Sequence, residues 1–173
     1  SLNMYVGIVG PSGATKTVAA GVADDLLNIG YKKAKVQGTG SGEGLIASYL
    51  RKNPDPPEGG GEAYVLRDDP HVCVLVDEIG MLGSIQGRSG STLAPVLRSG
   101  WSGAALETIN ADPTRKRIVP KGSYRLTVIA GIQPLAADVL FDDADTGTPQ
   151  RWLWLPALDP HMPDREPEWP GML

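Results

Sequence analysis

The 173-residue chain has one cysteine, one phenylalanine and two histidines, and no apolar run close to the ~20 residues that a bilayer span needs. With a single cysteine, Cys73, an internal disulfide framework is excluded. The N-terminus also lacks the basic and then apolar pattern of a secretion signal. We therefore expect a cytoplasmic protein without membrane contact. Because residue 1 is not methionine, we also expect a piece of a longer protein.

The chain lacks an excess of positive charge, since 16 basic residues face 20 acidic ones and the net charge is −4. This balance excludes a protein that coats nucleic acid with its whole surface, but it permits a local basic patch. The length and the apolar content of 41% are typical of one globular domain. We assign that domain to residues 1–158. Residues 159–173 hold several prolines and acids without periodicity, as a tail or linker does.

A glycine-rich loop near the N-terminus has the pattern of a phosphate-binding loop. Apolar residues 5–9 predict a strand, and residues 17–29 predict a helix that ends at Gly30. Small residues between them allow backbone N–H groups to point at an anion, while Lys16 suits the β/γ-phosphates and the Thr17 hydroxyl suits Mg²⁺. The loop residues are Gly10, Pro11, Ser12, Gly13, Ala14, Thr15, Lys16 and Thr17.

One residue of this loop departs from the usual pattern. Thr15 occupies the place of the second glycine, which normally lets the loop pass close under the phosphates. The alternative is an ordinary Gly/Ser turn between a strand and a helix.

A second candidate element is the apolar run 71–76, which is followed by Asp77 and Glu78. A run that is apolar on both faces predicts a central parallel strand. Asp77 at its tip would hold Mg²⁺, and Glu78 would polarise an attacking water. Glu43, in the glycine-rich loop 38–44, is a further candidate for orienting water, or it is an ordinary solvated carboxylate.

Alternating strand and helix patterns predict an α/β protein with three layers, in which helices flank a mostly parallel sheet. The expected strands also include residues 34–37, 63–66, 106–110, 123–130 and 152–155, and the expected helices include 45–51, 79–86, 92–100 and 135–140. Trp101, just after one of these helices, is either a core contact or a platform for base stacking, and we expect the core contact.

Five of the 16 basic residues lie between residues 115 and 125. Such a concentration in an acidic protein attracts phosphate backbones, so we expect a nucleic-acid contact there. The candidates are Arg115, Lys116, Arg117 and Lys121. The alternative is a solvated surface turn.

Two further polar residues follow predicted elements. Gln133 comes after the strand 123–130, at the place where one class of P-loop ATPases has a γ-phosphate sensor on a strand inserted beside the phosphate-loop strand. Arg151 precedes the last strand, where ring-forming motors often direct an arginine into a neighbour's nucleotide. Alternatively, Arg151 pairs within its own subunit with Asp142, Asp143 or Asp145.

Taken together, these motifs resemble the ATPase part of the bifunctional primase-polymerase/helicase proteins of actinobacteria and their phages. The segments that carry the resemblance, in order, are Gly10-Pro-Ser-Gly13, Gly42-Glu-Gly-Leu45, Val76-Asp-Glu-Ile79, Arg88-Ser-Gly-Ser-Thr-Leu93, Tyr124-Arg-Leu126, Gly131-Ile-Gln-Pro134 and Gly147-Thr-Pro-Gln-Arg-Trp-Leu153. The resemblance implies a RecA-like or AAA+-like motor that hydrolyses ATP with Mg²⁺. It further implies movement on single-stranded DNA in DNA replication, in a homo-oligomeric ring.

Two other functions are compatible with the same residues. A small-molecule kinase would share Lys16 and Asp77 but would need an acceptor pocket and a lid. A degenerate, non-catalytic nucleotide-binding assembly module would be consistent with Thr15 in the loop.

Overall fold

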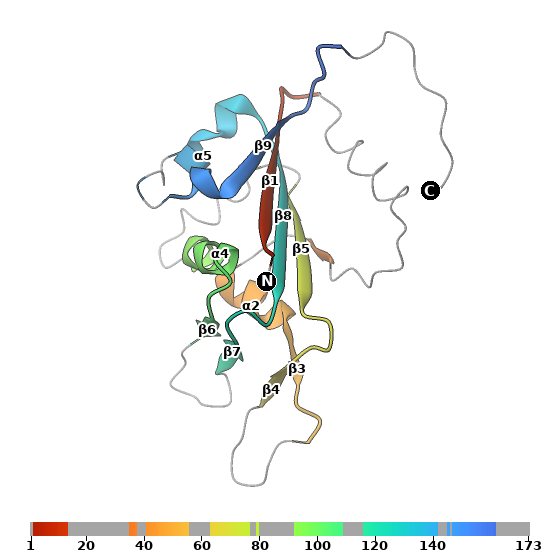
Figure 1. The fold of residues 1–173 in the computed structure, drawn as a ribbon, viewed down its shortest axis with the longest axis vertical. Coiled ribbons are helices and arrows are strands. Elements are labelled where there is room, and N and C mark those ends of the chain that lie inside the picture. The colour runs from red at the N-terminus through yellow and green to blue at the C-terminus, as the bar shows by residue number, and fades with distance from the viewer. Residues whose placement is uncertain are drawn as a thin grey trace, which may run out of the picture.

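The computed structural model describes residues 2–13, 35–37, 41–55, 63–76, 79, 92–108, 116–141, 145 and 147–161. Its centre is a five-stranded sheet (Figure 1). The strands are β1 (Met4–Val9), β2 (Lys35–Gln37), β5 (His71–Val76), β8 (Arg125–Ile132) and β9 (Trp152–Pro156). All four pairings in this sheet are parallel. The expected α/β class with a parallel sheet is therefore confirmed.

The strand order in this sheet is β2-β5-β8-β1-β9. β8 thus lies between β1 and β5, although it follows both of them in the sequence. Every strand boundary in the sheet falls within two residues of the boundary expected from the sequence. The apolar run 71–76 is an interior strand, as its two apolar faces predicted.

Both faces of the two central strands are apolar. On one face β5 and β8 place buried residues, which are Val72, Val74, Val76, Leu126, Val128, Ala130 and Ile132. The paired registers put Tyr5 of β1 and Trp152 of β9 on this same face. The other face carries the half-buried Cys73, Leu75 and Ile129. Burial on both faces is what holds a parallel sheet together in water.

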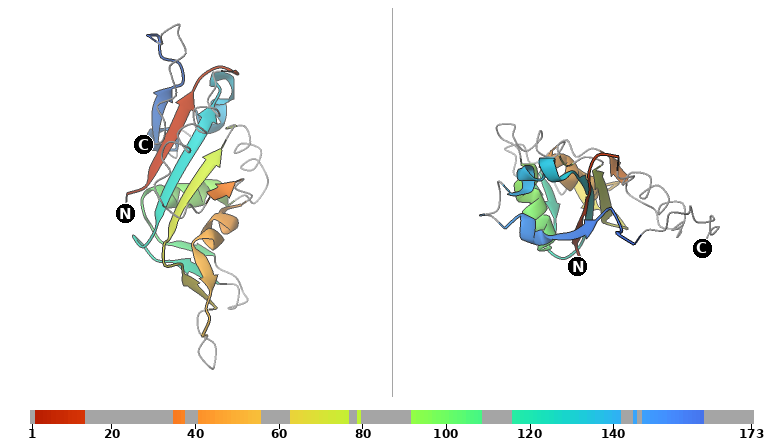
Figure 2. Two further views of the ribbon diagram at one scale, coloured as in Figure 1. Left: turned by 90° about the vertical axis from the view of Figure 1, so that its right-hand side faces the viewer. Right: turned by 90° about the horizontal axis from the view of Figure 1, so that it is seen from above.

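Described helices lie against the Tyr5 face of the sheet. α4 (Leu93–Trp101) packs there, and the Tyr5 hydroxyl donates a 2.6 Å hydrogen bond to the carbonyl of Leu97. The short helix α5 (Asp138–Phe141) lies on the same side of the sheet as α4, as the view from above shows (Figure 2). The helix predicted over 17–29 and nearly all of the one over 79–86 lie outside the described residues, so the third layer stays a prediction.

Two small antiparallel hairpins extend from the end of the sheet where its strands begin (Figure 1). One pairs β3 (Leu50–Lys52) with β4 (Tyr64–Leu66), and the other pairs β6 (Leu106–Thr108) with β7 (Arg117–Val119). The helix predicted over 45–51 was therefore wrong at its end. It is α2 (Gly42–Ser48), and the chain turns at Tyr49 because that ring is buried and its hydroxyl donates to the carbonyl of Arg125.

Two other expectations need correction. The side chain of Trp101 is 41% exposed at the end of α4 instead of lying in the core. The helix predicted over 135–140 is a 3₁₀ turn, Pro134–Ala136, followed by the short α5. No helix among the described residues is long and apolar enough to span a bilayer.

The start of α2 offers a test of its packing against α4. A Cβ at Gly42 would lie 2.5 Å from the carbonyl oxygen of Thr92, whereas a Cβ at Gly44 would come no closer than 3.6 Å to Ser41 Oγ. We expect Gly42→Ala to lower the free energy of unfolding by about 1–3 kcal/mol, because backbone atoms must move. Gly44→Ala should be neutral or stabilise the protein by up to about 1 kcal/mol. Urea unfolding of both variants measures the difference, and equal effects would contradict it.

Buried tyrosines make the fold sensitive to alkali. Burial raises the pKa of Tyr124 to about 12, and burial also raises the pKa values of Tyr5 and Tyr49. The folded state therefore holds these protons more tightly than the unfolded state. We expect full stability below pH 10, the ordinary tyrosine pKa, and a progressive loss as the pH rises from 10 to 12. Thermal unfolding followed between pH 8 and 12 checks this, and Tyr124→Phe should flatten the loss.

Candidate functional site

The carboxyl ends of the central strands meet at one edge of the sheet. Val9 of β1 pairs with Ile132 of β8 on one side and with Pro156 of β9 on the other. Beyond the last pair, the N–H of Gly10 donates a 3.0 Å hydrogen bond to the carbonyl of Ile132. The Val9 carbonyl in turn accepts from the N–H of Ala157 at 2.7 Å. The loop after β1 is thus tied to the strand ends on both sides of it.

The described start of the glycine-rich loop contains one left-handed residue, Gly13. Gly10 is buried, and Pro11, Ser12 and Gly13 are exposed. Gly13 has a φ of +82°, a left-handed conformation that favours glycine, and no atom lies within 4 Å of the position that a Cβ would take. Alternation between right- and left-handed residues turns successive N–H groups toward one point. The remaining loop residues, Ala14, Thr15, Lys16 and Thr17, lie outside the described part.

Gln133 lies beside this loop. It directly follows Ile132, whose carbonyl accepts the Gly10 N–H, and it starts the 3₁₀ turn by accepting from the N–H of Ala136 at 2.9 Å. Its side chain is half-buried. β8, whose last residue Ile132 directly precedes Gln133, lies between β1 and β5.

The third predicted part of this edge is only partly described. Val76, the last residue of β5, pairs with Ala130 of β8, so β5 ends toward the same edge. Asp77 and Glu78, which follow it, lie outside the described residues. Within the described part no group of histidine, cysteine or acidic side chains could hold a metal ion, and both predicted Mg²⁺ ligands, Thr17 and Asp77, fall outside it.

Glu43 is not brought to this edge. It lies exposed in the first turn of α2, whose N-cap is Ser41. At the other end of α2, the Tyr49 hydroxyl holds the carbonyl of Arg125, the first residue of β8. Figures 1 and 2 agree that α2 lies toward the end of the sheet where β1 begins. Of the two carboxylates considered for orienting water, Glu43 therefore lies away from the edge where the glycine-rich loop begins.

Arg151 also lies at the far end of the sheet. Trp152, the next residue, pairs with Tyr5, four positions before the Pro156–Val9 pair. At ~3.3 Å per residue, roughly 13 Å of strand separates Trp152 from Pro156, which pairs with Val9 just before the glycine-rich loop. The backbone of Arg151 therefore lies far from Gly10 of its own subunit.

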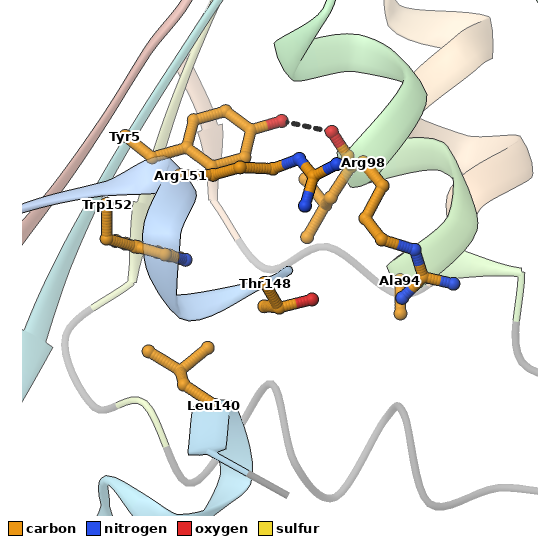
Figure 3. A pocket seen from close by; sticks show the side chains of 8 residues that line it. Tyr5, Ala94, Arg98, Leu140, Thr148, Arg151 and Trp152 are labelled. Atoms are coloured by element: carbon orange, nitrogen blue, oxygen red, sulfur yellow. Dashed lines mark hydrogen bonds between the residues drawn. The ribbon is translucent and has the colours of Figure 1, made fainter. Parts of the chain in front are cut away.

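The guanidinium of Arg151 is engaged within its own subunit. It donates to the carbonyl of Gly147 and lies over the Trp101 ring, with 5.6 Å from its carbon to the ring centroid. Gly147 is left-handed, with a φ of +77°, and a Cβ there would lie 2.8 Å from an Arg151 nitrogen. In Figure 3 the side chain runs alongside the Tyr5 ring toward α4. The cavity that Tyr5 and Arg151 line together with residues of α4 and Trp152 holds about 10 Å³, the room of one water molecule, so no nucleotide enters it.

In the basic segment, the described lysines are exposed to solvent and Arg117 packs against an aromatic ring. Lys116 and Lys121 are exposed, as a phosphate contact requires, and Arg115 lies outside the described residues. Arg117 is half-buried, and its guanidinium carbon lies 5.0 Å from the centroid of the Tyr64 ring. The sequence argument missed both arginine–aromatic contacts, because each joins residues that are far apart in the chain.

Comparisons of the chain with protein-family models, with curated proteins and with solved structures found no significant match.

The contacts of Arg151 lead to a measurable expectation. Arg151→Ala should lower the free energy of unfolding by about 1–2 kcal/mol, because the Gly147 hydrogen bond and the Trp101 stacking are lost. A double-mutant cycle with Trp101→Leu should give a coupling energy of about 0.5 kcal/mol or more. Urea unfolding of the two single variants and the double variant provides the measurement. Strict additivity would show that Arg151 does not stabilise its own subunit through Trp101.

Proposed function

We propose that this chain is a P-loop ATPase domain, the motor of a DNA helicase or primase-helicase that acts in DNA replication. One observation carries the proposal. β8 is inserted between β1 and β5, and it places Gln133 directly beside the glycine-rich loop that starts at Gly10. The strand order supports this class of fold independently of the motifs, since it follows from backbone pairing alone.

The spacing of the strands suits nucleotide hydrolysis. Neighbouring strands lie about 4.8 Å apart, so β5 is roughly 10 Å from β1 with β8 between them. That gap leaves room for a terminal phosphate, a hydrated Mg²⁺ ion and an attacking water between the loop after β1 and the carboxylates after β5. Gln133, at the end of the middle strand, would contact the γ-phosphate from this gap.

The remaining roles in the proposal belong to residues of the two motifs. Lys16 would hold the β- and γ-phosphates, and Thr17 and Asp77 would hold Mg²⁺, which supplies charge neutralisation to the transferred phosphoryl group. Glu78 would accept a proton from the attacking water. Backbone N–H groups of the loop would bind phosphate oxygens without needing a side chain, which is why Gly13 matters there.

A homo-oligomeric ring remains part of the proposal. Because the backbone of Arg151 lies far from Gly10 of its own subunit, we assign any contact of Arg151 with a phosphate to a neighbouring copy. For such a contact, the Arg151 guanidinium has to give up its hydrogen bond to the Gly147 carbonyl and bind the neighbour's nucleotide instead. An ATPase rate per subunit that rises with protein concentration, and that Arg151→Ala abolishes, would show this role. A rate independent of concentration would assign Arg151 to its own subunit alone.

The proposal predicts how two substitutions separate binding from turnover. Lys16→Ala should abolish tight nucleotide binding, because it removes the point charge nearest the β/γ-phosphates. Asp77→Asn should keep the fold and cut ATP turnover, because Mg²⁺ loses a ligand charge. Phosphate release is measured with and without single-stranded DNA, and far-ultraviolet circular dichroism confirms folding.

The same assay separates the alternatives. Turnover stimulated by single-stranded DNA supports the motor, and transfer of phosphate to a small acceptor supports a kinase. Nucleotide binding without turnover supports a non-catalytic assembly module. Normal hydrolysis by either variant would remove the ATPase function from this site.

A further inference from the structure

The two hairpins are joined by a stacked pair of side chains. The guanidinium of Arg117, on β7, lies over the ring of Tyr64, on β4, with 5.0 Å from its carbon to the ring centroid. Both side chains are half-buried. Within the described residues, the buried Arg117 Nε has no hydrogen-bond partner, and neither has Thr108 Oγ1, which lies directly opposite on β6. The stack therefore contains polar groups that the described part of the fold does not satisfy.

A third charge belongs to the same face. Lys52 of β3 lies directly opposite Tyr64 in the antiparallel pair, so their side chains share one face of the hairpin. Lys52 is exposed, and no hydrogen bond or ion pair of its side chain occurs among the described residues. Arg51, the preceding residue, points to the opposite face and forms a 3.3 Å ion pair with Asp68.

The charges around this stack are mostly positive. Lys121, which follows β7, is exposed like Lys52. Lys116 is also exposed, but it directly precedes Arg117 and by strand alternation falls on the side away from the stack, as Glu107 does. Of the other described carboxylates nearby in sequence, Asp55 follows β3 by three residues, Asp68 pairs with Arg51 and Asp69 with His71. Among the described residues, Lys52 and Arg117 thus place positive charge on the Tyr64 side of the hairpins.

We propose that the two hairpins form one surface for single-stranded DNA, in which Lys52 and Tyr64 of the β3–β4 hairpin act together with Arg117 and Lys121. This inference rests on the proposed function, and it adds to the basic segment a second hairpin that carries no cluster of positive charge in its sequence. The lysines contact phosphates, and the salt dependence of binding follows from them. The Tyr64–Arg117 stack offers a flat surface on which unpaired bases can stack, and it holds the guanidinium in a fixed plane.

The neighbouring residues Lys52 and Arg51 give a matched pair of variants. Both are exposed cations on β3, but they lie on opposite faces. Binding of the full chain to a fluorescent oligothymidine is measured by anisotropy over a series of salt concentrations. We expect Lys52→Ala to reduce the slope of log K against log[salt] by about 0.7, the value for one phosphate contact of a single strand. Arg51→Ala should leave both affinity and slope unchanged.

Variants of Tyr64 separate stacking from charge. Tyr64→Leu should weaken binding by about fivefold or more, in line with the loss of one stacked base, while the salt slope stays unchanged. Tyr64→Phe keeps the ring and should bind as the wild type does. Thermal unfolding of each variant shows whether the hairpins remain folded.

Each outcome of the binding experiment either supports or overturns the proposed surface. If Lys52→Ala and Tyr64→Leu bind as the wild type while Lys116→Ala and Lys121→Ala are weaker, the β3–β4 hairpin has no part in binding and the proposed motor function still stands. Equal losses for Lys52→Ala and Arg51→Ala would reduce the effect to net charge and overturn the surface. Tighter binding to duplex than to the single strand would overturn the stacking role. If the wild type binds no DNA at low salt, the DNA partner itself is excluded, whatever the ATPase assay shows.

Discussion

The structure depends on the parallel pairing of β8 between β1 and β5. This strand is hydrogen-bonded to a neighbour on each side, and four of its eight residues, all on the Tyr5 face, are fully buried. Parallel neighbours also end at the same edge, so three separate parts of the chain must deliver their next residues to one place. Gly10, Gln133 and Val76 reach this edge through backbone geometry, before any side-chain interaction is considered.

The opposite edge is organised by aromatic side chains that satisfy backbone carbonyls. The hydroxyls of Tyr5, Tyr49 and Tyr124 donate to the carbonyls of Leu97, Arg125 and Ala104. Each bond ties an element that lies outside the sheet, or its end, to the beginning of a strand. A buried hydroxyl without a partner would cost about 1–3 kcal/mol, so these bonds determine where α2 and α4 pack as strongly as the apolar contacts do. The hairpins extend from this edge because α2 and α4 are held there.

How much of the structure can be predicted from the sequence depends on whether each element forms through local or through long-range interactions. The strands of the sheet were predictable because their apolar period is intrinsic to each segment. The strand at residues 50–52 was not predictable, because the sequence pattern of the preceding helix continues through it. The helix ends instead where Tyr49 contacts Arg125, which is far away in the sequence. β7 was missed because its charges resemble a loop. At the site, the meeting of Gly10 and Gln133 followed from strand topology, whereas the contacts of Arg117 with Tyr64 and of Arg151 with Trp101 required three-dimensional packing that no local pattern contains.

The distance between the two ends of the sheet determines how the effects of substitutions at each end can be interpreted. β8 spans the distance between them, and its eight residues correspond to roughly 26 Å. This is more than twice the Debye length of about 8–10 Å at ordinary ionic strength, so a charge removed from a hairpin exerts almost no direct electrostatic effect on Gln133 or the glycine-rich loop. Communication between DNA at the hairpins and nucleotide at the strand ends would instead require a rearrangement of packed elements. Among the described elements, α2 connects the hairpin end of the sheet to α4, since its end contacts the beginning of β8 and its start packs against α4. A hairpin variant that changes basal ATP turnover without DNA would therefore indicate altered packing of α2, and one that changes only the stimulation by DNA would indicate a lost contact with the strand.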